Sequence, residues 1–172
     1  AVPHQGNLFG VDGQLDAIDD RLLAASVRDG QLWTAHNISV NFSGVSPGDR
    51  NGSRWYEIDV SSGAPELTQA GTLFDTAVTN PRFYWVPTIA VSGQGHAAIG
   101  ASASGVTERI NAATAARLAG DSLGALQGPT LYTASTFSYN PAGDPGPTRR
   151  WGNYSSASVD PSDDMTMWPI QQ

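Results

Sequence analysis

Two arginines and two aromatic residues stand together near the end of the chain, in the segment Arg149-Arg150-Trp151-Gly152-Asn153-Tyr154. A guanidinium can fork onto a carboxylate, and an aromatic face can stack on the flat side of a sugar ring. The candidate ligand-binding residues for a sugar or a carboxylate are Arg150, Trp151, Asn153 and Tyr154. The structural alternative is that Trp151 packs in the core and that Arg150 stacks on it.

A second aromatic cluster, Phe83-Tyr84-Trp85-Val86-Pro87, occupies the matching place before an earlier predicted hairpin. If the two hairpins are equivalent parts of a repeat, both clusters come to neighbouring positions around one axis. Tyr84 and Trp85 are therefore predicted to help line the same ligand site. The alternative is that they fill the seams between repeats.

Three carboxylates crowd one turn near the end of the chain, those of Asp160, Asp163 and Asp164. Calcium binds oxygen ligands of this kind. The spacing lacks the Asp-x-Asp-x-Asp-Gly loop, however, and aspartates commonly bond turn amides. These residues are weak candidates for calcium, and we expect no metal site and no cofactor.

No set of catalytic residues emerges from the sequence. Glycosidic hydrolysis needs two carboxylates facing each other about 5–9 Å apart. Glu57 and Asp59 share one face of a predicted strand, roughly 7 Å apart by the strand rise, and that face suits solvent as well as a substrate. No Gly-x-Ser-x-Gly nucleophile motif is present. We therefore predict no catalytic residue.

The composition limits the classes of partner. The 172-residue chain has a net charge of −7, and all nine of its cationic residues are arginines. An acidic protein without a basic stripe repels phosphate backbones, so we expect no nucleic-acid binding. Cysteine is absent, which excludes disulfides and thiolate zinc sites. No stretch approaches the roughly 18 apolar residues of a membrane-spanning helix.

The elements that position these residues recur along the chain. Three strand–turn–strand segments align on Val27, Val91 and Val159, which are 64 and 68 residues apart. In the first segment, Asp29-Gly30 is a preferred pair for a tight hairpin turn, because Gly tolerates a positive φ. The predicted hairpins lie near residues 21–40, 83–102 and 150–172.

Further strands are predicted between the hairpins, at residues 54–60, 66–74, 107–119 and 130–139. The strand at 66–74 is expected to open the second repeat unit. Residues 107–119 have helical propensity, but their place in the repeat favours a strand. Residues 1–18 are rich in Gly and Asp and predict a loose N-terminal segment.

A unit of about 65 residues with four short strands predicts an all-β, antiparallel fold made of four-stranded β-propeller blades. A lectin-like β-sandwich is the alternative, because short alternating strands serve both folds. Residues 1–172 supply two to three blades, whereas rings need at least four. We therefore expect a single propeller segment whose ring is closed by additional blades or by self-association.

A turn motif accompanies the first hairpin. Residues 26–33 fit the pattern Ser-x-Asp-x-Gly-x-x-Trp at Ser26, Gly30 and Trp33, with Arg28 where the pattern has Asp. This pattern is the Asp box, so the hairpin resembles the blades of bacterial sialidase-like β-propellers. The resemblance implies a propeller, in which the Asp box holds the blade turn away from the ligand pocket.

A second partial copy begins at Ser158-Val159-Asp160, where a longer turn displaces Trp168. Residues 150–164 look most specifically like segments of exported bacterial sialidase-like proteins. Those proteins usually have Arg-Trp-Gly-Asp-Tyr, so Asn153 is a departure. The resemblance implies a secreted, periplasmic or cell-surface protein.

The same resemblance shapes the expected function. Sialidases need three arginines around the sugar carboxylate, a Tyr–Glu pair and an acidic Asp, and this set cannot be placed in the chain. We expect an exported, non-catalytic binding or scaffold module for a carbohydrate or for an envelope or protein partner. The alternative is a fragment of an exo-sialidase-like glycoside hydrolase whose catalytic residues lie largely outside this chain.

Overall fold

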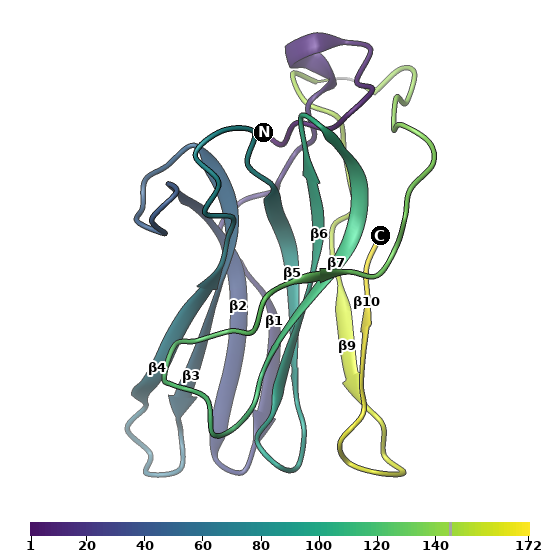
Figure 1. Cartoon of the computed structure of the whole chain (residues 1–172). Coiled ribbons are helices and arrows are strands. Elements are labelled where there is room, and N and C mark those ends of the chain that lie inside the picture. Colours follow the sequence, from purple (N-terminus) through teal and green to yellow (C-terminus); the bar gives the residue numbers. More distant parts are fainter. Residues whose placement is uncertain (145) are drawn as a thin grey trace.

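A computed structural model describes residues 1–144 and 146–172 of the chain (Figure 1). These residues contain ten antiparallel strands, one short 3-10 helix and no α-helix, which confirms the all-β prediction. The elements are η1 (Gly10–Gly13), β1 (Leu22–Arg28), β2 (Gln31–Val40), β3 (Arg50–Asp59), β4 (Glu66–Leu73), β5 (Phe83–Val91), β6 (Ala97–Gly105), β7 (Glu108–Arg117), β8 (Thr130–Leu131), β9 (Ser156–Val159) and β10 (Met167–Ile170).

The strands pair in chain order. β1–β4 form one four-stranded sheet, β5–β8 form a second, and β9 and β10 form a two-stranded sheet. In the described part of the chain these sheets do not close into a ring. One prediction is wrong: β4 does not open the second unit but pairs with β3 as the last strand of the first sheet.

Each sheet begins with one of the three predicted hairpins. In the first, Asp29 and Gly30 have φ values of 50° and 75°, as a two-residue turn between twisted strands requires. The predicted strand at 107–119 is confirmed as β7, which pairs along β6. Its alanines fit there because the second sheet, which contains β6 and β7, is packed between other strands on both sides and leaves room for small side chains.

The predicted strand at 130–139 is wrong beyond its first two residues. β8 pairs with β7 only through Thr130 and Leu131. Beyond Leu131, side chains accept hydrogen bonds that backbone carbonyls would accept in a β-ladder. Ala112 N donates to Thr133 Oγ1, and Ser135 N donates to Asn111 Oδ1. The segment follows β7 without pairing to it as a strand.

The main core lies between the first and second sheets. Trp33 and Trp55 stack with their ring centroids 5.7 Å apart, and both are almost fully buried. The Arg117 guanidinium lies 5.9 and 5.8 Å from the two ring centroids and donates to the Asp121 carbonyl. Aromatic rings attract a cation placed in this way, so Arg117 closes the core at the end of β7.

The N-terminal segment is not loose, which corrects the prediction for residues 1–18. Val2 and Leu15 are fully buried and exchange backbone hydrogen bonds of 2.8 Å. They pack with Trp85, Val86 and other apolar residues in a second core beside the second sheet. The sequence of this segment does not indicate that it packs in a core, because most of its residues are polar or Gly and only a few supply apolar contacts.

The turns of the three hairpins meet at one end of the molecule. Arg28, at the end of β1, forms an ion pair with Asp164 in the β9–β10 turn. The backbone N of Gly93, in the β5–β6 turn, donates to the Asp164 carbonyl over 2.9 Å. Figure 1 shows these turns at the bottom and η1 at the opposite end.

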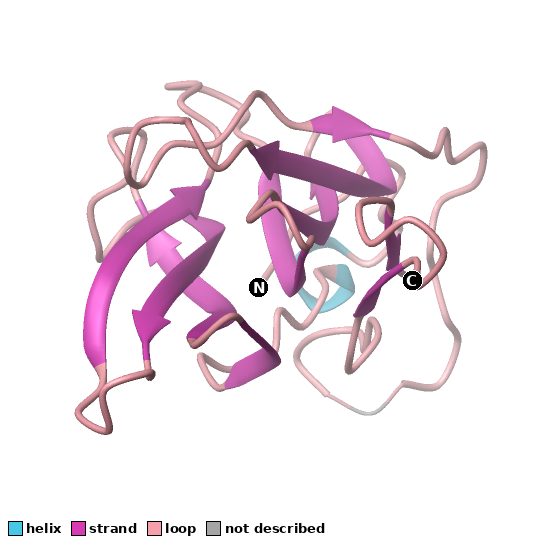
Figure 2. Cartoon of the chain, turned by 90° about the horizontal axis from the view of Figure 1, so that it is seen from below, coloured by secondary structure: helices cyan, strands magenta, loops and turns pink. Residues whose placement is uncertain are grey.

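The second sheet is the middle layer. β5 contacts β1, β2 and β3 on one side and β9 and β10 on the other. All nine residues of β5 and all nine of β6 are buried. Seen from below, the three sheets lie side by side around the middle of the molecule (Figure 2). None of the described segments forms a helix long and apolar enough to cross a membrane.

Candidate ligand-binding site

The segment that carries the Arg-Trp cluster is tied to the N-terminal segment. Arg149 N donates to the Gln14 carbonyl over 2.7 Å, and Asp16 N donates to the Arg149 carbonyl over 2.8 Å. The Arg149 guanidinium lies 4.6 Å from the centroid of the Phe9 ring and donates to the Asp144 carbonyl. Arg149 therefore holds the structure together.

Arg150 differs from its neighbour because its backbone is fixed while its side chain is exposed. Its N donates to Asp144 Oδ2 over 2.6 Å, and its carbonyl accepts from the Tyr139 hydroxyl over 2.8 Å. Among the residues that the structure describes, its guanidinium makes no hydrogen bond or ion pair. This donor group is therefore held in place and available to a ligand.

A hollow of about 430 Å³ lies beside Arg150. Its lining brings together three of the six predicted ligand-binding residues and adds three that the sequence did not indicate. The lining residues are Tyr139, Arg150, Gly152, Asn153, Tyr154 and Gln172. The hollow is therefore rich in hydrogen-bonding groups and carries two aromatic rings.

Gly152 and Gln172 form one wall of the hollow. Gly152 has φ 53°, which favours glycine, and a Cβ atom there would lie 2.4 Å from Gln172 Oε1. The close approach brings the C-terminal strand segment against the Arg-Trp segment. No local sequence pattern marks Gln172 as part of a site, because only the packing of the hairpin puts it there.

Trp151 belongs mainly to the fold. Its indole Nε1 donates to Ser102 Oγ over 3.1 Å, and its ring meets that of Tyr139 edge-on, with centroids 5.0 Å apart. It is half-buried and packs against the second core. Tyr139 therefore links the site to the core, since its hydroxyl bonds Arg150 while its ring supports Trp151.

Tyr154 is an exposed residue of the lining of the hollow. It is 65% exposed. The pKa of Arg21, just before β1, is raised chiefly by its hydrogen bond with Asp19 and by the charge of Asp19, and more weakly by Tyr154. Arg21 itself is ion-paired with Asp19 and is not among the residues that line the hollow.

Tyr84 and Trp85 are placed differently from the other predicted ligand-binding residues. They are 2% and 0% exposed and lie in the two cores, on opposite faces of β5. Neither lines the hollow beside Arg150. The structure therefore does not bring these two residues together with Arg150, Asn153 and Tyr154.

The contacts of Tyr84 are internal. Its hydroxyl lies 3.3 Å from Arg82 Nη1, and Arg82 also forms an ion pair with Glu108. Burial raises the pKa of the Tyr84 phenol, and the nearby Arg82 opposes this only in part. Arg82 is the counterpart of Arg150 before the second hairpin, but Glu108 neutralises its charge within the protein.

Two of the three aspartates of the last turn bond the turn itself, and the third, Asp164, pairs with Arg28. Asp160 Oδ1 accepts from Ser162, and Asp163 accepts from the backbone N of Met165 and Thr166. The Ser162 and Thr166 bonds lower the pKa values of Asp160 and Asp163, respectively. Within residues 1–144 and 146–172, no group of three or more His, Asp or Glu side chains is placed to hold a metal ion.

No protein-family model, no curated protein and no solved structure matches this chain. The functional argument therefore depends on the geometry of the site and on the arrangement of the sheets.

Proposed function

We propose that the three sheets are blades of a β-propeller segment, and that the chain is an exported, non-catalytic binding module. Its ligand is a carboxylate-bearing carbohydrate that occupies the hollow beside Arg150. The observation that carries this proposal is the Arg150 side chain, which is exposed above the hollow while its backbone is fixed on both sides.

The arrangement of the sheets supports the propeller. In such a fold the first strand of each blade lies nearest the axis and the blades follow one another in chain order. Here β5 contacts both β1 and β9, the two four-stranded sheets are meanders that start with their hairpins, and β9–β10 is a hairpin. The ion pair between Arg28 and Asp164 joins the first and third turns across the second.

The lining of the hollow supports the ligand class. Arg150 supplies charge-assisted donors for a carboxylate, and Asn153 and Gln172 supply amide groups for hydroxyls. Tyr139 and Tyr154 add aromatic surface. The net charge of −7 disfavours polyanions, whereas one arginine suffices for a single carboxylate.

The lack of a carboxylate among the described residues that line the hollow favours binding over hydrolysis. None of the residues that line the hollow is a carboxylate. Glu57 accepts a hydrogen bond from Gln69, whose other amide atom accepts from Gly124 N. Two carboxylates flanking a sugar bond are what glycosidases need, and this hollow lacks them.

The second candidate function is that of a glycoside hydrolase fragment. Tyr84, Arg82 and Glu108 favour it, because they combine a phenol, a guanidinium and a carboxylate in direct contact. Tyr84 is 2% exposed, however, and a substrate would need the first and second sheets to separate. Turnover of a fluorogenic sialoside by this chain would establish the hydrolase and overturn the binding module.

Arg150→Ala tests the binding proposal. Hydrogen bonds to charged groups contribute about 1.5–3 kcal/mol. We therefore expect binding to carboxylate-bearing glycans on a glycan array to weaken about ten- to hundred-fold. Because the side chain is exposed and only its backbone is bonded, the melting temperature should stay nearly unchanged.

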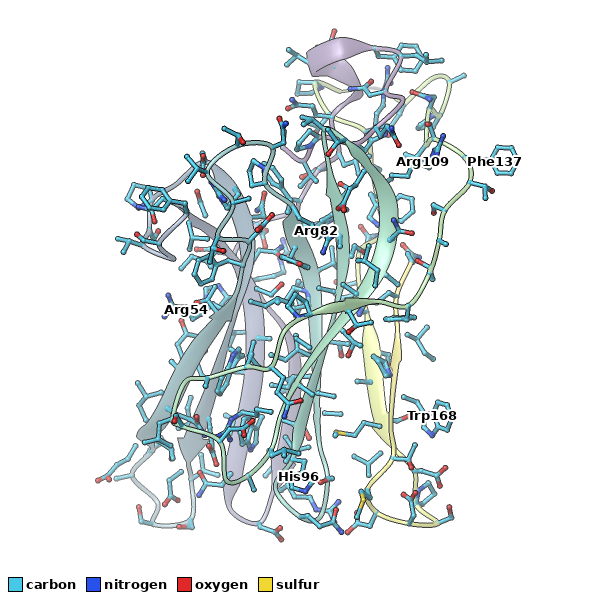
Figure 3. All side chains as sticks on the ribbon, viewed as in Figure 1. Arg54, Arg82, His96, Arg109, Phe137 and Trp168 are labelled. Atoms are coloured by element: carbon cyan, nitrogen blue, oxygen red, sulfur yellow. The ribbon has the colours of Figure 1, made fainter. Side chains whose placement is uncertain are left out.

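Arg54→Ala is the matched control. Arg54 lies on β3, and Figure 3 shows it on the far side of the molecule from the β9–β10 hairpin. It should leave array binding intact. Unchanged binding by Arg150→Ala, or a drop of several degrees in its melting temperature without loss of binding, would mean that the cluster serves the fold.

A further inference from the structure

Trp33 and Trp168 occupy the same place in two equivalent hairpins. Trp33 on β2 pairs with Ser26 on β1, and Trp168 on β10 pairs with Ser158 on β9. Each serine directly precedes the valine on which the repeats align. The register therefore makes these tryptophans structural counterparts, although the longer third turn separates them in the sequence pattern.

The two tryptophans differ in what covers them. Trp33 is 2% exposed because the second sheet packs on its face. Trp168 is 57% exposed and Ile170, on the same face of β10, is 68% exposed. The opposite face of β10 is the one that packs on the second sheet, since Pro169 and Gln171 lie against Gly100. The face of Trp168 is thus the open end of a stack of sheets.

The other end of the stack is also open. The face of the second sheet that covers Trp33 carries Ile89 and Val91, each 3% exposed. By the repeat alignment, its counterpart on the first sheet carries Ala25 and Val27, and Val27 is 67% exposed. A hollow of about 370 Å³ lies there, lined by Leu22, Leu23, Ala24, Ala25, Leu32, Thr34 and Ile58.

We propose that two copies of this chain pair head to tail through these two faces. The donor face, formed by Trp168 and Ile170 of one copy, packs on the acceptor face, formed by Leu22, Ala25, Val27, Leu32 and Ile58 of the other. This contact repeats between chains the interface that already joins the first and second sheets within the chain.

The geometry favours a closed pair. Each copy carries one donor face and one acceptor face, so a two-fold axis engages all four faces and leaves none for further growth. Two copies bring together six sheets, which falls within the roughly four to eight blades of closed propellers. Both faces expose large apolar side chains, with Ser158 and Ser156 beside Trp168 and Ile170 on the donor face, and exposed apolar groups of this kind mark an association surface.

The test is the solution mass by light scattering over a range of concentrations. We expect wild-type protein to reach twice the chain mass of 18.0 kDa. Trp168→Ser on the donor face and Val27→Asp on the acceptor face should each raise the dimer dissociation constant tenfold or more, because a buried tryptophan or an apolar contact at an interface centre has a large effect.

Mixing the two variants tests the head-to-tail arrangement. The Val27→Asp copy keeps an intact donor face and the Trp168→Ser copy keeps an intact acceptor face, so the mixture should pair more tightly than either variant alone. Phe137→Ser is the matched control, since Phe137 is 86% exposed and belongs to neither face. It should dimerise like the wild type.

Three results would overturn the proposal. They are a wild-type monomer at every concentration, a dimer that neither variant weakens, and a mixture that pairs no better than its components. Far-UV circular dichroism checks that the variants are folded. If Val27→Asp is not, Leu22→Asp replaces it, because Leu22 is 63% exposed on the same face.

Discussion

The β5–β6 and β9–β10 hairpins are both antiparallel, and they lie in different surroundings. β5–β6 has sheets on both sides, and its second strand consists of Ala, Gly, Ser and a single Ile, all buried. β9–β10 is covered on one side only, and β10 alternates between half-buried and exposed residues. β6 therefore has small residues where two layers press on it, whereas β10 carries large apolar residues where a layer ends.

Trp33 and Trp168 allow the effect of the surroundings to be compared at one equivalent position of two hairpins. Both sit at the same register, yet one is 2% exposed and the other 57% exposed. The difference lies in the neighbouring sheet, since the hairpin geometry is shared. Burial in this fold thus depends on whether another sheet packs on the outer face of each hairpin.

The largest expected effect contrasts these two residues directly. Trp33→Ala removes a ring that stacks on Trp55 and should lower the free energy of unfolding by about 3–5 kcal/mol. Trp168→Ala should change it by no more than about 0.5 kcal/mol in dilute solution. Urea denaturation of both variants measures the difference. An equal loss of unfolding free energy in the two variants would contradict the placement of Trp33 in the core and of Trp168 on an exposed face.

A smaller effect is expected where the third hairpin meets the second sheet. A Cβ atom at Gly100 would lie 2.9 Å from the Pro169 Cβ and 2.6 Å from Gln171 Nε2. Gly100→Val should therefore push the hairpin away and cost about 1–3 kcal/mol. Hydrogen exchange should show faster exchange in β9 and β10 while β1–β4 keep their protection. Equal loss of protection from exchange in β1–β4 and in β9–β10 would mean that the β9–β10 hairpin does not form a separate layer.

The smallest effect is expected at the meeting point of the turns. The Arg28–Asp164 ion pair is partly exposed, and such pairs contribute little and are screened by salt. Asp164→Ala should lower the melting temperature slightly at low ionic strength, and the difference from wild type should vanish at high salt. A difference that persists at high salt would indicate that Asp164 acts through something other than charge.

The sequence predicts the three hairpins well because each has strong local signals. Val27 and Val91 lie in runs of alternating apolar residues that are each followed by a turn with Gly. Val159 is followed by an Asp-rich turn. All three hairpins form at the predicted places. The strand at 107–119 follows from its place in the repeat, against its helical propensity. Sheet membership is harder to predict, since β4 could be assigned to either neighbouring unit until its pairing with β3 is known.

The candidate site is only partly predictable for a similar reason. Arg150, Asn153 and Tyr154 lie within five consecutive residues, so their proximity in the sequence is enough to bring them together. Tyr84 and Trp85 sit on a strand covered on both faces, and no local pattern distinguishes that strand from one with an open face. Gln172 joins the site through packing across Gly152, which the sequence does not mark.

Hydroxyl-radical footprinting of the tryptophans at increasing protein concentration tests the central claim most directly. In dilute solution Trp168 should be oxidised much faster than Trp33. As the concentration rises, Trp168 should become as protected as Trp33, because a second copy then covers its face. Equal oxidation of the two tryptophans in dilute solution, or a Trp168 rate that does not change with concentration, would contradict the account.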